Sequence, residues 1–324
     1  MQILTRLRRL RRTPEIRRLL DMPFPAASKF VWPVFVVEGK GRREEIPSMP
    51  GQCRVSVDLL PQWVEPVVRQ GVGSVLLFGQ TEKAKDAAGS GAFSPRGAVQ
   101  KAIPVLKRAF PDLVVMTDVC LCAYTDHGHC GPLDRHGQVD NDAACELLTK
   151  VAVSHAQAGA DVVAPSAMMD GQVMAIRDAL DENDFTQTLL MSYSTKFASA
   201  MYGPFRDAEN SAPSAGDRKG YQASYANLRV ALSESDLDED EGADILMVKP
   251  ALFYLDVLAK LRERTDLPVA AYNVSGEYSM LIATAERGWG DLHGMVRESL
   301  MALDRAGADL IISYWASRYA EFVQ

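Results

Sequence analysis

Residues 242–250 read Gly-Ala-Asp-Ile-Leu-Met-Val-Lys-Pro, and this stretch indicates the fold. A short apolar run, residues 245–248, directly follows a Gly-Ala-Asp tripeptide and ends at a lysine and a proline. The same tripeptide precedes an apolar run at Gly159 and at Gly307. Because glycine commonly ends a helix in a left-handed conformation, we interpret each tripeptide as a turn from a helix into a buried strand.

From residue 31 onward, short apolar runs of this kind alternate with longer amphipathic segments. Strands that are buried on both faces of a parallel sheet are continuously apolar, and longer amphipathic segments such as 143–158 and 295–306 are typical of helices. Eight strand–helix units predict a (β/α)8 TIM barrel over residues 30–324. The alternative is an open doubly wound sheet, but such sheets usually have fewer strands, and no phosphate-binding glycine fingerprint follows the first run. The eight predicted strands are residues 31–37, 74–78, 113–119, 161–166, 188–194, 245–248, 269–274 and 310–314.

The first 29 residues differ from the rest of the chain in composition. Seven arginines fall within residues 1–18, and Pro23 and Pro25 then mark a linker. We interpret residues 1–29 as an arm outside the barrel. A transit peptide and an anion-binding tail are the alternatives.

The overall composition excludes several classes of protein. The chain has 324 residues, of which 47% are hydrophobic, and its net charge of −7 argues against general nucleic-acid binding. Its longest apolar run, residues 30–37, is interrupted by Pro33 and is too short to span a membrane. No hydrophobic segment follows the basic N-terminus, so we expect no signal peptide. The five cysteines are an odd number and a poor disulfide framework, so we expect a reducing, cytoplasmic location.

Three cysteines lie close together in the sequence, one directly before the segment 121–140 and two within it. Cys120, Cys122 and Cys130 follow the third predicted strand, and thiolates suit a borderline-soft ion such as zinc. Three protein ligands leave one position open, as a catalytic zinc site requires. Unpaired thiols and a redox pair are the alternatives.

Two lysines end neighbouring predicted strands. Lys196 follows the fifth strand and Lys249 the sixth, so their amines are expected to share one cavity at the carboxyl end of the barrel. Burial and a second ammonium group both lower the pKa of a lysine, and a neutral amine can attack a ketone to form a Schiff base. Alternatively, each lysine reaches out to solvent.

The segment 201–222 is rich in glycine, proline and charge, and we predict that it forms a lid loop. Arg206 and Arg218 within it have the planar donors that bind carboxylates in a bidentate manner. Placed over the lysines, they indicate an anionic ketone substrate. Alternatively, they are solvated loop charges.

Several ordered stretches together resemble the porphobilinogen synthase (5-aminolevulinate dehydratase) family. They are residues 117–131 (TDVCLCAYTDHGHCG), 192–207 (SYSTKFASAMYGPFRD), 216–222 (GDRKGYQ), 247–250 (MVKP) and 272–278 (YNVSGEY). The resemblance covers the chain from about residue 30 to its end. It implies a lyase that condenses two 5-aminolevulinate molecules to porphobilinogen with loss of two waters, in tetrapyrrole (heme) synthesis.

The resemblance also implies roles for individual residues. Lys249 would hold the propionate-side substrate as a Schiff base, and Lys196 the acetate-side substrate. The three cysteines would bind the catalytic zinc of the zinc-dependent type. The implied substrate contacts are Ser275, Tyr314, Asp118 and Ser166 for the first molecule, and Arg206, Arg218, Gln222, Tyr202 and Phe205 for the second.

The family further implies a homo-octamer and an allosteric magnesium. The arm would wrap a neighbouring subunit, and Glu234, fifteen positions before Lys249, would bind magnesium near a subunit interface. Alternatively, the acidic run that Glu234 begins is a solvated helix face. The rival functions are a class I aldolase, which needs one lysine, and a non-catalytic zinc scaffold, which needs none.

Overall fold

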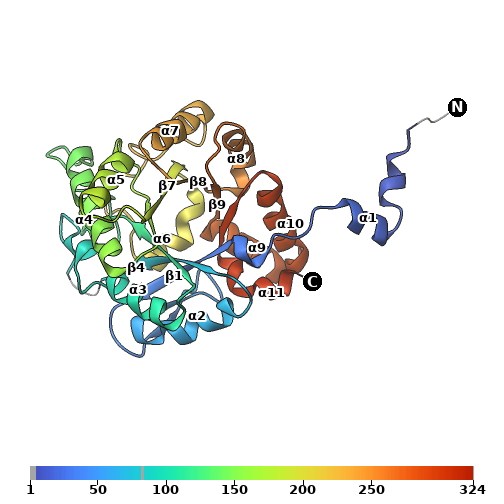
Figure 1. Ribbon diagram of the computed structural model, residues 1–324, viewed down its shortest axis with the longest axis horizontal. Helices are drawn as coiled ribbons and strands as arrows, with labels where there is room; N and C mark the ends of the chain where they lie inside the picture. Colours follow the sequence, from blue (N-terminus) through green and yellow to red (C-terminus); the bar gives the residue numbers. More distant parts are fainter. Residues whose placement is uncertain (1–4, 82–83, 324) are drawn as a thin grey trace.

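The computed structural model describes residues 5–81 and 84–323, and within them eight parallel strands close into a barrel (Figure 1). Neighbouring strands follow the chain order, and the last strand pairs with the first. The predicted (β/α)8 barrel is therefore confirmed, and the open doubly wound sheet is wrong. The barrel strands are β1 (Phe30–Val37), β4 (Ser74–Gly79), β5 (Val114–Val119), β6 (Val162–Pro165), β7 (Leu189–Lys196), β8 (Ile245–Lys249), β9 (Val269–Asn273) and β10 (Leu310–Ser313).

Helices surround the barrel and bury the outer face of its strands (Figure 1). Every residue of β1, β6, β8 and β9 is buried, which explains why these strands are continuously apolar rather than alternating. The helices of the outer layer are α2 (Leu60–Val68), α3 (Ala98–Ala109), α4 (Asn141–Ala158), α5 (Gln172–Glu182), α7 (Leu228–Asp240), α8 (Leu255–Arg262), α9 (Ser275–Glu286) and α10 (Leu292–Arg305), followed by the short α11 (Tyr319–Phe322).

The three Gly-Ala-Asp tripeptides form the turns that the sequence predicts. Gly159, Gly242 and Gly307 have φ of 98°, 99° and 107°, a left-handed conformation that favours glycine. The following aspartates each accept a hydrogen bond from a backbone N–H at the start of the preceding barrel strand. The pairs are Asp161 with Val115 (2.8 Å), Asp244 with Leu190 (2.7 Å) and Asp309 with Val269 (2.9 Å).

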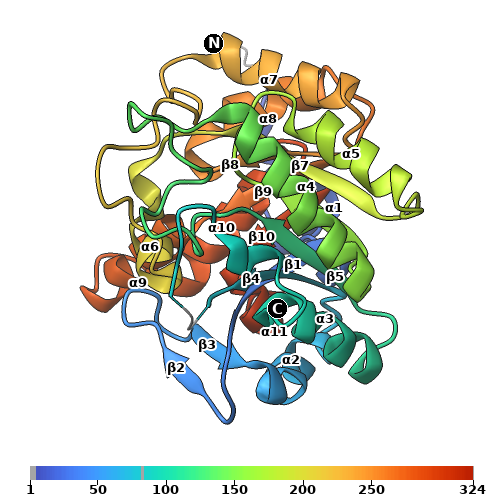
Figure 2. The ribbon, with the colours of Figure 1, turned by 90° about the vertical axis from the view of Figure 1, so that its left-hand side faces the viewer.

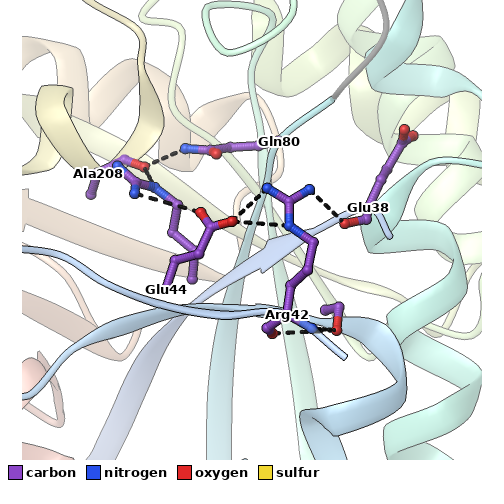
Figure 3. Close-up of polar contacts among 7 residues, drawn as sticks. Glu38, Arg42, Glu44, Gln80 and Ala208 are labelled. Carbon is purple, nitrogen blue, oxygen red and sulfur yellow. Dashed lines mark hydrogen bonds and ion pairs between the residues drawn. The ribbon is translucent and has the colours of Figure 1, made fainter. Parts of the chain in front are cut away.

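A small hairpin that the sequence analysis missed lies beside the barrel (Figure 2). Its strands are β2 (Arg43–Glu45) and β3 (Cys53–Ser56), and β3 pairs in parallel with the end of β1. Arg42 donates two hydrogen bonds to Glu44, at 2.9 and 2.6 Å, and one to the Glu38 carbonyl at 3.2 Å (Figure 3). These contacts fix the hairpin against the loop that follows β1.

The end of the N-terminal arm contacts the barrel, because Lys29 pairs with Asp304 (2.7 Å) and the Tyr319 hydroxyl donates to the Pro25 carbonyl (3.1 Å). The part of the arm over residues 5–20 lies apart from the barrel (Figure 1). It contains a 3-10 turn at Leu7–Arg11 and the helix α1 (Pro14–Leu20), and neither element buries a residue. Leu19 is 82% exposed, so the arm presents apolar side chains to solvent. No helix among the described residues is long and apolar enough to cross a membrane.

Candidate active site

A cavity at the carboxyl ends of β5 to β8 collects most of the predicted site residues. We call it the barrel cavity. It lies where the loops of a TIM barrel place catalytic groups, because the strand ends and the loops that follow them converge there. The predicted residues that line it are Asp118, Cys120, Cys122, Ser166, Lys196, Phe205, Arg218 and Lys249.

Lys249 ends β8 and is buried in the barrel cavity, with aromatic rings around its amine. The Nζ atom lies 4.2 Å from the ring centre of Tyr272, 4.8 Å from that of Tyr193 and 5.0 Å from that of Phe205. Burial, and then the charge of Lys196, lower the pKa of Lys249 to about 7. A large fraction of this amine is therefore neutral and nucleophilic at neutral pH.

Lys196 lies directly opposite Lys249, because the register of β7 and β8 pairs the two residues. It is also buried, and its Nζ donates a hydrogen bond to the Ser166 carbonyl. Two lysines side by side at the carboxyl end confirm the placement expected from the strand ends. The alternative, in which each lysine reaches solvent, is wrong.

The three cysteines form a compact buried cluster. Their sulfur atoms all lie within 4.8 Å of one another, and the Cys120 and Cys122 sulfurs are 3.4 Å apart. Hydrogen bonds from the neighbouring thiols hold the pKa of Cys130 well below its usual range, because they stabilise the thiolate. Sulfurs about 2.3 Å from a shared zinc would show similar spacings, so the donor set fits zinc. Elsewhere in residues 5–81 and 84–323, no other three histidine, cysteine or carboxylate side chains gather in this way.

Asp118 completes the floor of the barrel cavity at the end of β5. One carboxylate oxygen is buried and has no hydrogen-bond partner among the described residues. Burial raises the pKa of Asp118, although the nearby charges of Lys196 and Lys249 oppose this effect. Such an oxygen is available to a ligand that carries an amine.

The predicted lid loop contains a short helix, α6 (Gly203–Glu209), so the expectation of an irregular loop over 201–222 is partly wrong. Proline in the first turn favours a helix start, and the sequence analysis took it as a loop signal. Arg218 donates hydrogen bonds to the carbonyls of Gly128 (2.9 Å) and Ser211 (2.6 Å), which tie the lid to the cysteine loop. The Nε atoms of Arg206 and Arg218 are buried without a partner among the described residues.

Some predicted substrate contacts lie next to the barrel cavity rather than in its lining. Tyr202 donates from its hydroxyl to the Lys249 carbonyl (3.0 Å), and the hydroxyls of Tyr314 and Tyr272 are 3.3 Å apart. The Ser275 hydroxyl accepts a hydrogen bond from the backbone N–H of Phe205 (3.0 Å). These residues surround the cavity and hold the lid.

Glu234 and Gln222 line an open pocket that is distinct from the barrel cavity, together with Asp170, so the predicted substrate contact Gln222 is not part of the cavity lining. Glu234 is half-buried on α7, and burial, then the charges of Asp170 and Glu241, raise its pKa. Neither amide atom of Gln222 has a partner among the described residues.

Several residues of the barrel cavity have no individual role predicted from the sequence. Tyr193 and Tyr272 surround Lys249, but within apolar strands they resembled ordinary core residues. Glu209 also lines the barrel cavity. An acid in a charged segment is typical of a solvated surface, and only the helical spacing from Arg206 could have indicated otherwise.

Comparison with known proteins identifies the family. The family model "Delta-aminolevulinic acid dehydratase" matches residues 4–322. The chain belongs to the delta-aminolevulinic acid dehydratase family. Relatives of that name are 51% identical in Synechococcus elongatus, over 98% of this chain and 98% of theirs, and 53% identical in Methanothermobacter thermautotrophicus, over 96% and 95%.

Among solved structures, the chain is similar to the delta-aminolevulinic acid dehydratase of Toxoplasma gondii in complex with its reaction product porphobilinogen. The TM-score is 0.96 at 43% identity, and the match covers 99% of this chain and 92% of that one. The resemblance inferred from the sequence is confirmed. Membership of the delta-aminolevulinic acid dehydratase family therefore rests on the whole barrel as well as on its motifs.

Proposed function

We propose that this chain condenses two molecules of 5-aminolevulinate to porphobilinogen with loss of two waters, as a hydro-lyase of tetrapyrrole (heme) biosynthesis. The observation that carries the proposal is the pairing of Lys196 and Lys249, two buried lysines opposite each other beside three thiols. A class I aldolase needs only one of the two lysines, and a zinc scaffold needs neither. Family membership favours the same choice.

The two lysines account for the waters that are lost. The neutral amine of Lys249 attacks the ketone carbon of the first substrate, and the ketone oxygen leaves as water when the Schiff base forms. Lys196 binds the second substrate in the same way and releases the second water. Carbon–carbon and carbon–nitrogen bonds then join the two substrates, and ring closure returns both lysines as free amines.

The aromatic rings around Lys249 contribute to the burial of its amine. They exclude water, and this disfavours the ammonium form that cannot attack a ketone.

Cys120, Cys122 and Cys130 would hold a zinc ion, which supplies Lewis-acid polarisation of the second substrate when bound. The unpartnered Nε atoms of Arg206 and Arg218 are suited to the carboxylate of this substrate. Gln222 lines the neighbouring pocket rather than the barrel cavity, and its buried amide, unpartnered among the described residues, is a further proposed contact at the boundary of the two. Ser275 and Tyr314 would take the carboxylate of the first substrate, with Asp118 and Ser166 at its amine.

Incubation of the full chain with 5-aminolevulinate, followed by a colour test for the pyrrole, tests the function. Borohydride reduction during turnover should fix substrate mass on the peptide that contains Lys249. Lys249→Ala should form no pyrrole, whereas Lys101→Ala, an exposed change on α3, should retain activity. Full activity of Lys249→Ala would refute the mechanism.

Assembly and regulation are part of the same proposal. We infer a cytoplasmic homo-octamer in which the arm packs on a neighbouring subunit, since its leucines are exposed in the single chain. We also infer that Glu234 binds an allosteric magnesium, since magnesium often needs one or two carboxylates and keeps its waters. Magnesium should then raise the activity of zinc-replete wild type but not of Glu234→Ala. An equal response of both proteins would contradict the assignment.

A further inference from the structure

The small hairpin of β2 and β3 carries none of the proposed catalytic residues, yet it contacts the lid. The hairpin lies next to α6 (Figure 2). Arg54 on β3 donates hydrogen bonds from its guanidinium to the carbonyls of Ala208 (2.7 Å) and Asp207 (2.8 Å), near the end of α6. The two segments are far apart in the sequence, so the contact belongs to the tertiary structure alone.

Other side chains from outside the lid bind the same end of α6. Lys85 donates to the Asn210 carbonyl (2.7 Å). Gln80 donates to the Ala208 carbonyl (Figure 3). The last carbonyls of a helix have no partner within the helix, and their partial negative charge favours cations. Arg54 is the central contact of this group, because it is a cation that binds two of the carbonyls at once.

The hairpin holds Arg54 in place for this contact. Glu44 on β2 forms an ion pair with Arg54 at 4.0 Å, and Arg42 in turn donates two hydrogen bonds to Glu44. The Arg54 side chain is 19% exposed, so water competes only partly for its donors. The guanidinium is therefore oriented by its own strand pair before it meets the lid.

The helix α6 depends on contacts of this kind because it is short. It has seven residues, whereas isolated helices shorter than about 12–15 residues are marginal in water. At its start, Tyr202 donates to the Lys249 carbonyl and Phe205 donates to the Ser275 hydroxyl. At its other end, Arg54 supplies two hydrogen bonds. The conformation of α6 is thus determined by its two ends, one at the active site and one at the hairpin.

The helix presents two side chains to the site. The Phe205 ring centre lies 5.0 Å from Nζ of Lys249, and Arg206, proposed for the carboxylate of the second substrate, directly precedes the two residues whose carbonyls Arg54 binds. A shift of the end of α6 would therefore move both side chains.

We propose that Arg54 is a positioning residue, which holds α6, and with it Arg206 and Phe205, in the conformation that binds the second substrate. This inference rests on the proposed function. Without the contact, α6 occupies this conformation for a smaller fraction of the time, and the apparent affinity for substrate falls by that fraction. Bound substrate restores the conformation, so the rate at saturation changes little.

The test measures the lid and the activity separately. Arg54→Gln removes the cation, and Arg54→Lys keeps the charge but lacks the planar fork that binds two carbonyls. Arg43→Gln is the matched control, because Arg43 is exposed on β2 and lies over the ring of Trp63 (4.7 Å) rather than against the lid. Hydrogen exchange of the full chain without substrate reports the opening of α6, and pyrrole formation gives KM and kcat.

In Arg54→Gln, the amides of α6 should exchange about 10- to 100-fold faster, the range for loss of one charge-assisted hydrogen bond, while those of β5 and β8 keep the wild-type rate. KM should rise about 10-fold, and kcat should stay within about twofold. Arg54→Lys should lie between wild type and Arg54→Gln. Arg43→Gln should match wild type in every measurement.

Unchanged exchange of α6 would overturn the proposal, and so would faster exchange with an unchanged KM. Equally faster exchange of α6 and the barrel strands would also overturn it, because Arg54 would then stabilise the whole fold rather than the lid. If Arg54→Gln fails to fold, Arg54→Lys decides by the same criteria. Absence of pyrrole formation by wild type, with faster exchange of α6 alone in Arg54→Gln, would refute the proposed function and support the role of Arg54 in holding the lid.

Discussion

Lys249→Met should stabilise the protein while it abolishes activity. Burial, with the charge of Lys196, lowers the pKa of Lys249 to about 7, whereas a lysine in an unfolded chain has a pKa of about 10.4. Between these values the unfolded chain binds a proton that the folded chain does not, so protonation favours unfolding. At pH 7 this difference in pKa destabilises the folded state by about 4 kcal/mol. Replacement of Lys249 by methionine removes this destabilisation.

The gain in stability of the methionine variant should depend on pH. The methionine variant should be more stable by about 2–4 kcal/mol at and below pH 7, after relaxation of the buried site. The gain should shrink as the pH rises and be nearly lost above about pH 10.4, because neither state of the wild type then holds the proton. Methionine also packs well against aromatic rings, so little is lost by the exchange.

Denaturant unfolding, followed by circular dichroism at neutral and at alkaline pH, measures the difference. Lys101→Met, an exposed change on α3, is the control and should have a small effect at every pH. A Lys249→Met variant that is less stable than wild type at pH 7 would refute the reasoning. A gain that does not depend on pH would refute it equally, because packing rather than charge would then explain it.

Three further predictions concern the metal, the turns and the arm. Cys122→Ser should weaken zinc binding at least about 100-fold in competition with a chromogenic chelator, because one of three ligands is lost, and unchanged affinity would contradict the site. Gly307→Ala should lower the free energy of unfolding by at least about 1–2 kcal/mol, because φ is 107° and a Cβ atom would lie 2.7 Å from Cγ of Arg262; a neutral result in a denaturant titration would count against this. Removal of residues 1–25 should give smaller species by light scattering, and an octamer that persists would show that the arm is dispensable for assembly.

The sequence predicts the barrel well because its strands are buried on both faces. Continuous apolar runs located all eight barrel strands, and the strand ends placed Lys196 beside Lys249. The strand β2 was missed because it reads Arg-Glu-Glu and its middle residue alone is partly buried. Short polar strands at the edge of a sheet carry no hydrophobic pattern, so only their pairing partner defines them.

The interior of the site was harder to predict than its position. Composition shows that Tyr193 and Tyr272 are strand residues, but their contact with the Lys249 amine depends on which way each side chain points in the closed barrel. The helix α6 was hidden by Gly203 and Pro204, which also mark loops. Glu209 required the tertiary structure, since its burial results from the fold of the lid over the strand ends.

The Gly-Ala-Asp turns stabilise one end of the barrel, and the loops at the other end, which carry the catalytic residues, can vary in sequence. Their aspartates join the amino ends of neighbouring strands, and the lysines and cysteines lie at or beyond the opposite ends. A strand of five or six residues separates the two levels by about 17–20 Å. Substitutions in the catalytic loops therefore leave these aspartate hydrogen bonds intact. A library of variants confined to those loops would retain a barrel whose stability does not depend on the catalytic residues.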